Sequence, residues 1–186
     1  MSSEVSAWEI GMHPQQKAPH HALWLMPTGE VRQRLAGMIL DLSREYAAPA
    51  FEPHVTLASG IVGPGREVAS KMAELARRIS PFTIRLTEVD FLDEYFRCLF
   101  VRVATTHPIM NANKAARAVF SLAKQPAFMP HLSLLYADLP SGVKERIVAS
   151  LGRRFELEFK VSRLHLYLIK GGAAAWRRAA RFGLGL

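Results

Sequence analysis

The stretch Pro130-His131-Leu132-Ser133-Leu134-Leu135-Tyr136 repeats a pattern that the chain has already used at Pro53-His54-Val55-Thr56-Leu57. Each copy reads proline, histidine, an aliphatic residue, a small hydroxyl residue and leucine. In a β-strand, residues two apart share a face. Each copy therefore directs an imidazole and a hydroxyl to one side and aliphatic side chains to the other. Because one copy lies in each half of the chain, we expect the two to face each other across one cleft.

Helical and strand patterns alternate around these two motifs. Apolar residues at helical spacing predict helices, whereas apolar runs and alternation predict strands. The predicted helices cover 30–47, 68–79, 108–120 and 143–151, and the predicted strands cover 20–26, 54–59, a hairpin within 82–103, 131–137, 155–161, 164–168 and 176–182. This mixture predicts an α+β fold with mixed or antiparallel sheets, not a doubly wound parallel sheet.

The length of 186 residues suits one domain or two lobes that share a sheet system. Residues 1–19 show little periodicity and are predicted to form a loose arm, which leaves 20–186 as one domain. The N-terminus lacks the basic and apolar segments of a secretory signal, and no run of about 20 apolar residues could span a membrane. We expect a cytoplasmic protein. The lone Cys98 excludes an internal disulfide and is predicted to be a buried core residue.

Composition and the paired motifs both favour a phosphate ligand. The formal net charge of +8 favours anions such as nucleotides and RNA ends, although a merely solvated basic surface is the alternative. Two histidines suffice for acid–base cleavage of a phosphoester, because the pKa of an imidazole lies near working pH. Thr56 and Ser133 would donate hydrogen bonds to the non-bridging phosphate oxygens. A metal site would need a third convergent ligand, which neither motif contains, so we expect no metal and no cofactor.

A single His-x-Thr tripeptide on a strand is ordinarily structural, but two matched copies favour a shared function. The pair resembles the signature of the 2H phosphoesterase superfamily, in which His-x-Thr/Ser occurs twice. Glu52–Leu57, Tyr95–Phe100, Pro130–Tyr136 and the closing Trp176–Phe182 are similar to its cyclic phosphodiesterase branch. The resemblance covers 20–186. It implies a bilobal α+β fold with two sheets, flanking helices and a central cleft.

The resemblance also implies an activity and a role for each motif residue. It implies metal-independent hydrolysis of a 2′,3′-cyclic nucleotide or of ADP-ribose 1″,2″-cyclic phosphate to a phosphomonoester. His54 and His131 would form the catalytic pair, while Thr56 and Ser133 would hold the phosphate. In the usual assignment of the family, His131 activates water and His54 protonates the departing ring oxygen.

Two aromatic residues, Trp24 and Tyr136, match positions that line the substrate site in this branch. Taken alone, Trp24 is an ordinary core aromatic. Tyr136 follows His131 by five residues, so a regular strand would direct it to the opposite face. Its place in the site therefore requires a bend or a bulge near the end of the strand.

Two other functions are compatible with the same residues. One is an RNA-processing 2H enzyme that acts on 2′–5′ linkages or RNA ends, which a long basic groove leading from the histidines would favour. The other is a non-catalytic nucleotide- or RNA-binding module. The expected partner is a small cyclic phosphate nucleotide, with RNA ends as the second class and no membrane. The sequence predicts no particular oligomeric state.

Overall fold

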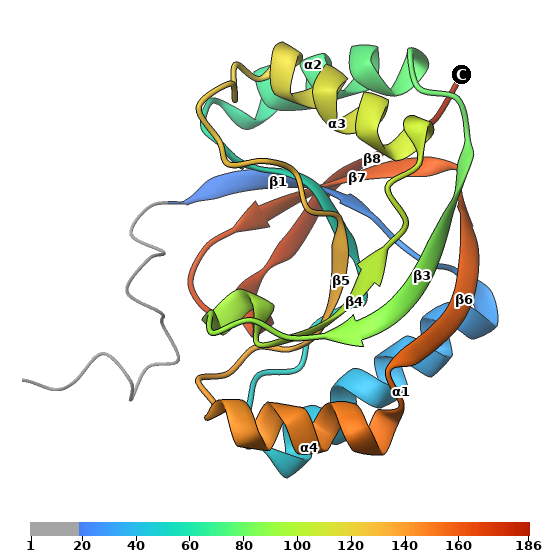
Figure 1. The fold of residues 1–186 in the computed structure, drawn as a ribbon. Helices are drawn as coiled ribbons and strands as arrows, with labels where there is room; N and C mark the ends of the chain where they lie inside the picture. Colours follow the sequence, from blue (N-terminus) through green and yellow to red (C-terminus); the bar gives the residue numbers. More distant parts are fainter. Residues whose placement is uncertain (1–18) are drawn as a thin grey trace, which may run out of the picture.

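The computed structural model describes residues 19–186, where eight strands and four α-helices alternate along the chain (Figure 1). Residues 1–18 of the predicted N-terminal arm lie outside the described residues. The strands are β1 (His20–Leu25), β2 (Val55–Ile61), β3 (Phe82–Asp90), β4 (Leu99–Val103), β5 (His131–Leu135), β6 (Arg154–Val161), β7 (Arg163–Ile169) and β8 (Arg177–Gly183). The helices are α1 (Gly29–Glu45), α2 (Gly65–Arg77), α3 (His107–Val119) and α4 (Ser141–Leu151), with short 3₁₀ turns at η2 (Tyr95–Arg97) and η3 (Ala173–Ala175).

All eight strands belong to one sheet in the order β6-β3-β4-β5-β2-β1-β7-β8, and every pairing is antiparallel. The sheet divides naturally into two four-stranded halves, each with one histidine motif in its inner strand. The halves join through the pair Val55↔Leu132. The predicted α+β fold is confirmed, and the two expected sheets are the two halves of this continuous sheet.

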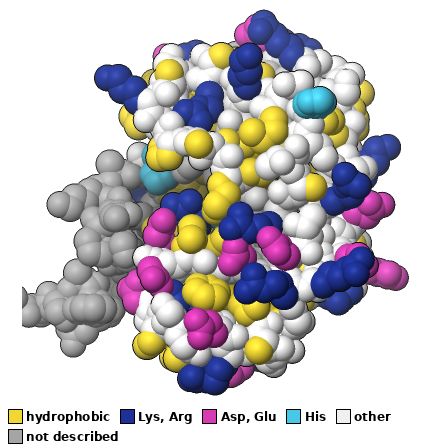
Figure 2. All heavy atoms as spheres, in the orientation of Figure 1, with side chains coloured by type: hydrophobic (Ala, Val, Ile, Leu, Met, Phe, Trp, Pro, Cys, Tyr) yellow, Lys and Arg dark blue, Asp and Glu magenta, His cyan; other side chains and the backbone are white. Residues whose placement is uncertain are grey.

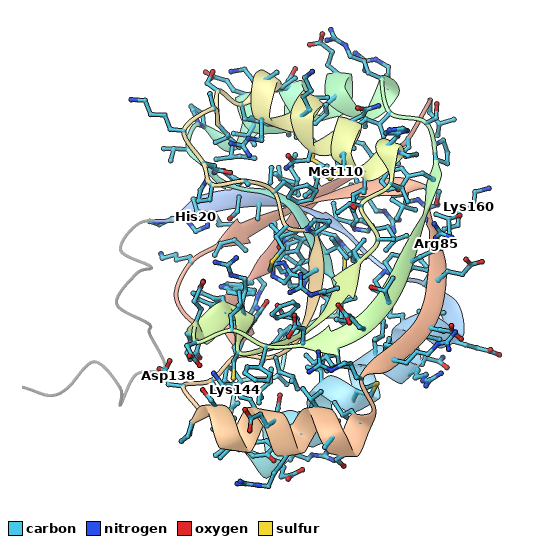
Figure 3. All side chains as sticks on the ribbon, in the orientation of Figure 1. His20, Arg85, Met110, Asp138, Lys144 and Lys160 are labelled. Carbon is cyan, nitrogen blue, oxygen red and sulfur yellow. The ribbon has the colours of Figure 1, made fainter. Side chains whose placement is uncertain are left out.

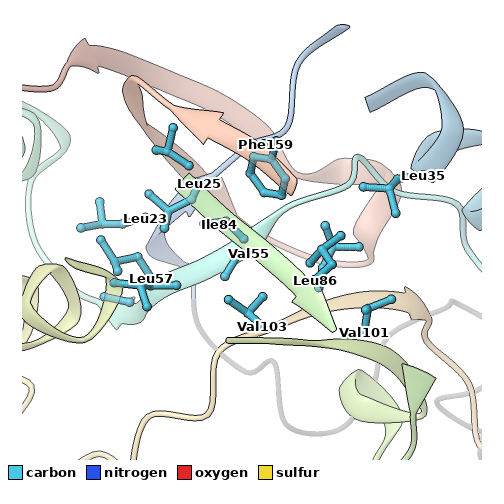
Figure 4. Close-up of a cluster of buried hydrophobic side chains, with 14 of the residues drawn as sticks. Leu23, Leu25, Leu35, Val55, Leu57, Ile84, Leu86, Val101, Val103 and Phe159 are labelled. Carbon is cyan, nitrogen blue, oxygen red and sulfur yellow. The ribbon is translucent and has the colours of Figure 1, made fainter. Parts of the chain in front are cut away.

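One face of the sheet carries the main hydrophobic core. Apolar side chains from both halves meet there, as Figure 4 shows for Leu25, Val55, Ile84 and Val101. All four helices bury their apolar stripes in this cluster; α2, for example, buries Val68, Met72, Leu75 and Ala76. Figure 1 shows α2 and α3 together at one end and α1 and α4 together at the other. None of the helices in residues 19–186 is long and apolar enough to cross a membrane.

The opposite face carries a smaller apolar cluster and both histidine motifs. The cluster consists of Ala22, Trp24, Met26, Tyr167 and Ile169, with Trp176 packed against it. Val55 and Leu132 point to the core, so the alternation of the strands turns their neighbours to this second face. We call it the cleft face.

A β-bulge follows the hydroxyl residue in each of the two central strands. In β2, Trp24 pairs with Thr56 but Leu23 pairs with Ala58, which leaves Leu57 as the extra residue. In β5, the pairs Phe100↔Ser133 and Leu99↔Leu135 leave Leu134 as the extra residue. Each bulge turns two consecutive apolar residues to the core and returns the next side chain to the cleft face.

Candidate active site

The cleft face contains a pocket of ≈ 470 Å³ at the junction of the two halves of the sheet. Within the range usual for small-molecule sites, this volume is enough for a nucleotide-sized ligand. All six predicted site residues line it: Trp24, His54, Thr56, His131, Ser133 and Tyr136.

The pairing of β2 with β5 brings the two motifs together. Val55 lies opposite Leu132 on antiparallel strands, so one step in either direction sets His54 opposite Ser133 and Thr56 opposite His131. An approximate two-fold axis therefore passes through this pair. Each imidazole has the hydroxyl of the other motif as its cross-strand neighbour.

Both imidazoles are held in the same tautomer by the chain that precedes them. Nδ1 of His54 lies 2.6 Å from the carbonyl oxygen of Glu52, and Nδ1 of His131 lies 2.8 Å from that of Met129. A carbonyl oxygen can only accept, so each Nδ1 must carry the proton and donate it. Nε2 is then the nitrogen that gains or loses a proton, as acid–base catalysis requires.

The environments of the two histidines differ despite this symmetry. His54 is 5% exposed and lies flat against Trp24, with ring centroids 3.5 Å apart. Burial lowers the pKa of His54 from 6.5 to about 4; repulsion from His131 lowers it too, and the hydrogen bond to Glu52 opposes the change. Burial also lowers the pKa of His131, against the effect of its bond to Met129. The depression is larger at His54, so His54 is the imidazole that more readily stays neutral.

A stack of aromatic rings packs against one face of the His54 imidazole. Tyr167 packs on Trp24 with centroids 3.7 Å apart, so Trp24 is sandwiched between His54 and Tyr167. The Tyr167 hydroxyl donates to Oε1 of Glu52 at 2.8 Å, and Arg32 pairs with Oε2 of the same carboxylate at 3.3 Å. Glu52 therefore orients His54 through its carbonyl and anchors the stack through its side chain.

The two motif hydroxyls are not equally available for a ligand. Oγ of Ser133 donates to the carbonyl oxygen of Phe96 at 3.1 Å. For Thr56, no side-chain hydrogen bond is found to another of residues 19–186. Thr56 can thus donate to a bound phosphate directly, whereas Ser133 must first leave Phe96.

The bulge at Leu134 explains why Tyr136 reaches the pocket. Without that extra residue, Tyr136 would point away from His131, and with it the side chain returns to the cleft face. Tyr136 is 4% exposed and stacks on Phe51, with centroids 3.9 Å apart. Burial raises the pKa of the Tyr136 hydroxyl, so this group is a neutral hydrogen-bonding and packing group at neutral pH.

Several pocket residues were not predicted from the sequence as site residues. His20, Arg97, Gln125, Phe128 and Trp176 all line the pocket. The segment 125–129 is held in place because Gln125 Nε2 donates to the carbonyl oxygen of Ser59 at 2.6 Å. Its position immediately before the second motif is the one sequence signal that could have indicated its role.

The turn that carries Arg97 is anchored from α4. Lys144 is 2% exposed and donates Nζ to the carbonyl oxygen of Leu92 at 3.0 Å. It also pairs with Asp93, and this contact lowers the pKa of that carboxyl group. A buried cation thereby fixes the start of the loop that leads to η2. Among residues 19–186, no group of three His, Cys, Asp or Glu side chains is arranged to hold a metal ion.

Comparisons with known proteins agree with the fold and with the predicted family. The model of the 2′-5′ RNA ligase superfamily matches residues 20–173. The chain is 28% identical to an Arabidopsis thaliana protein named cyclic phosphodiesterase over 125 residues, which cover 67% of this chain and 69% of that protein.

Two solved structures share the fold over nearly their whole length. TT0787 of Thermus thermophilus has a TM-score of 0.63 and 18% identity, covering 89% of this chain and 98% of its own. LigT of E. coli in its apo form has a TM-score of 0.60 and 17% identity, covering 90% of this chain and 99% of its own. LigT has also been solved in complex with 3′-AMP. The family match covers most of the chain and confirms the family predicted from the motifs: the protein belongs to the 2′-5′ RNA ligase superfamily, that is, to the 2H phosphoesterases.

Proposed function

We propose that this 2H phosphoesterase, a hydrolase of phosphodiester bonds, opens a cyclic phosphodiester to a phosphomonoester with His54 and His131 as its acid–base pair. The observation that carries the proposal is the matched pair of imidazoles in one pocket, each with Nδ1 held by a backbone carbonyl. In such a pair, one imidazole can take a proton from the attacking water and the other can give a proton to the leaving oxygen of the same phosphate.

The reaction balances with the groups present. The neutral Nε2 of one imidazole takes a proton from water as the water oxygen bonds to phosphorus. The Nε2–H of the other, protonated imidazole gives its proton to the ring oxygen as the P–O bond breaks. Thr56 and Ser133 donate hydrogen bonds to the non-bridging oxygens, where negative charge builds. The imidazoles finish with their protonation states exchanged, and proton exchange with solvent restores them.

The unequal environments favour one division of roles. A base must be neutral at the start, and the more strongly lowered pKa of His54 favours that state. We therefore assign His54 as the base and His131 as the acid. This reverses the assignment that the family resemblance implies.

A small cyclic nucleotide is the substrate class we favour. The pocket volume of ≈ 470 Å³ suits such a ligand, and Trp24, Phe96, Tyr136 and Trp176 offer ring surface to a base or ribose. The Arabidopsis relative is named cyclic phosphodiesterase, and LigT binds 3′-AMP in a crystal. The substrates we propose are 2′,3′-cyclic nucleotides or ADP-ribose 1″,2″-cyclic phosphate, in the cytoplasm as the sequence predicts.

The direct test is product analysis by phosphorus NMR in buffer that contains EDTA. The protein should convert the cyclic phosphate signal of a 2′,3′-cyclic nucleotide or of ADP-ribose cyclic phosphate into a monoester signal. Tight binding of all these compounds without any monoester would instead indicate a binding module.

The description of the matched family, 2′-5′ RNA ligase, favours an RNA-processing function as the second candidate. A 2′–5′ phosphodiester could occupy the same position between the imidazoles. Cleavage of a 2′–5′ linked dinucleotide at a higher kcat/KM than any cyclic phosphate would favour this alternative.

A further inference from the structure

We propose that the protein has a second phosphate-binding site, in a pocket of ≈ 210 Å³ formed by the start of α1, the end of β6, and the strands β7 and β8. We call it the arginine pocket; it is lined by Arg32, Glu52, Lys160, Arg163, His165, Arg178 and Arg181, with Met26, Pro27, Thr28 and Ser162. This site does not depend on the function proposed for the histidine pair.

The register of β7 and β8 gathers these cations on one face. His165 pairs with Arg181, and Tyr167 pairs with Arg178. Leu164 and Leu166 point to the main core, so His165 and Tyr167 point to the cleft face with their partners. Arg163 lies two residues before His165 and shares its face. The pairing of β7 with β8 thus brings Arg163, Arg178 and Arg181 to the same face of the sheet.

The charges in the arginine pocket are not balanced from within. Five cationic side chains meet one carboxylate, that of Glu52, which Arg32 and Tyr167 already engage. In the part of the chain that the structure describes, no ion pair includes Lys160, Arg163, Arg178 or Arg181. On the face seen in Figure 2, by contrast, basic side chains are interspersed with acidic ones in the lower half. Cations that outnumber the carboxylates around them in this way attract an anion.

His165 adds a buried polar atom that lacks a partner. Its Nδ1 is inaccessible to solvent and has no hydrogen-bond partner among residues 19–186. Burial, followed by repulsion from Arg178, Arg181 and Arg163, lowers the pKa of His165 to about 4, and Glu52 opposes this. A phosphate in the pocket would offset the repulsion from the three arginines and thereby favour the imidazolium form of His165. The groups around His165 in the arginine pocket therefore favour a bound oxyanion.

The first turn of α1 also favours phosphate binding in the arginine pocket. Thr28, the N-cap of this 17-residue helix, lines the arginine pocket and makes no side-chain capping bond. Free N–H groups and the positive end of the helix dipole are favourable for a phosphate. This helix end and the arginines of β7 and β8 lie in separate parts of the chain, so they support the site independently.

The arginine pocket is distinct from the histidine pocket. The two share no lining residue: Trp24 lines the histidine pocket, and Tyr167, which stacks on Trp24, donates to Glu52 of the arginine pocket. Figure 3 shows Lys160 of the arginine pocket and His20 of the histidine pocket at opposite edges of the molecule. Glu52 connects the two sites, because its carboxylate lines one and its carbonyl oxygen holds His54 in the other.

The test is an NMR titration of the histidine side chains with inorganic phosphate. Because signals are assigned residue by residue, His165 reports the arginine pocket while His54 and His131 report the other. We expect phosphate to shift the His165 signals and to raise its pKa by at least one unit. If His165 is unmoved at phosphate concentrations that saturate the other two histidines, the proposal is wrong.

Variants separate a built site from general surface charge. The double variant Arg178→Gln/Arg181→Gln should weaken the phosphate affinity reported by His165 at least about tenfold, since each arginine supplies charge-assisted hydrogen bonds. Arg77→Gln removes an exposed cation at the end of α2 and should leave that affinity unchanged. Equal effects of the double variant and of the control would overturn the proposal.

A second arm of the titration identifies the source of the phosphate. An oligodeoxythymidylate lacks the 2′-hydroxyl and offers only diester phosphates and bases. If it shifts His165 at lower concentrations than inorganic phosphate does, the site holds a phosphate of a nucleotide chain. If inorganic phosphate is the tighter ligand, the site holds a free phosphate. In either case, binding must depend on Arg178 and Arg181.

Discussion

Replacing His54 by asparagine should make the protein less sensitive to acid. The pKa of His54 falls from 6.5 to about 4 on folding, mainly because the imidazole is buried. The neutral form is therefore the one that the fold favours. Its contribution to stability is complete above pH 6.5 and is lost as the pH falls toward 4. Between pH 7 and pH 5 this linkage lowers the free energy of unfolding by about 2 kcal/mol.

The assay is urea denaturation of the wild-type protein and of His54→Asn at several pH values from 7 to 5. Asparagine is neutral throughout, and its amide can still donate to the carbonyl oxygen of Glu52. The free energy of unfolding of the variant should fall by about 2 kcal/mol less than that of the wild type over this range. His107→Asn, at an exposed histidine that begins α3, controls for the loss of one histidine. If the free energy of unfolding depends on pH in the same way for the wild type and His54→Asn, the burial of neutral His54 is not a cause of the acid sensitivity.

Further predictions concern the hydroxyls and the division of roles. Thr56→Val should lower kcat/KM about 10²–10³-fold, as for one lost oxyanion donor. Ser133→Ala should lower kcat/KM by a smaller factor, because Ser133 donates to Phe96 in the free protein. The control Thr83→Val, at an exposed position of β3, should leave kcat/KM unchanged. A good leaving group makes the general acid dispensable. On thymidine 3′-(p-nitrophenyl phosphate), His131→Asn should therefore approach the wild-type rate and His54→Asn should stay slow; the opposite pattern would reverse the two roles.

The parts of the site that lie within one strand could be predicted from the sequence. The spacing of two residues between His131 and Ser133 fixes a shared face on any strand, and the same holds for His54 and Thr56. The presence of the motif in both halves favoured a common cleft, and the structure brings the four side chains into one pocket. Strand periodicity depends only on neighbouring residues, so it can be predicted from the sequence without knowledge of the fold.

The place of Tyr136 was harder to predict because it depends on a bulge. A bulge inserts one residue, and a one-residue shift moves every later side chain to the other face. Nothing in the run Leu134-Leu135 distinguishes a bulged strand from a regular one. The register against β4 is what shows that Leu134 is the extra residue.

Contacts between distant strands lay beyond the reach of sequence reasoning. The stack of Tyr167 on Trp24 joins β7 to β1, and the hydrogen bond from Tyr167 to Glu52 joins β7 to the segment before β2. Only the strand order places β7 beside β1. The same holds for the arginine pocket, whose cations entered the sequence analysis only through the formal net charge of +8.

The central claim is that two imidazoles act together on one phosphate, and kinetics of single-histidine variants test it most directly. We expect kcat/KM for a 2′,3′-cyclic nucleotide to fall about 10²–10⁴-fold in both His54→Asn and His131→Asn, which is the usual contribution of a general acid or base. Both variants should keep the wild-type fold at neutral pH. Full activity in His131→Asn, with the protein folded, would contradict the claim.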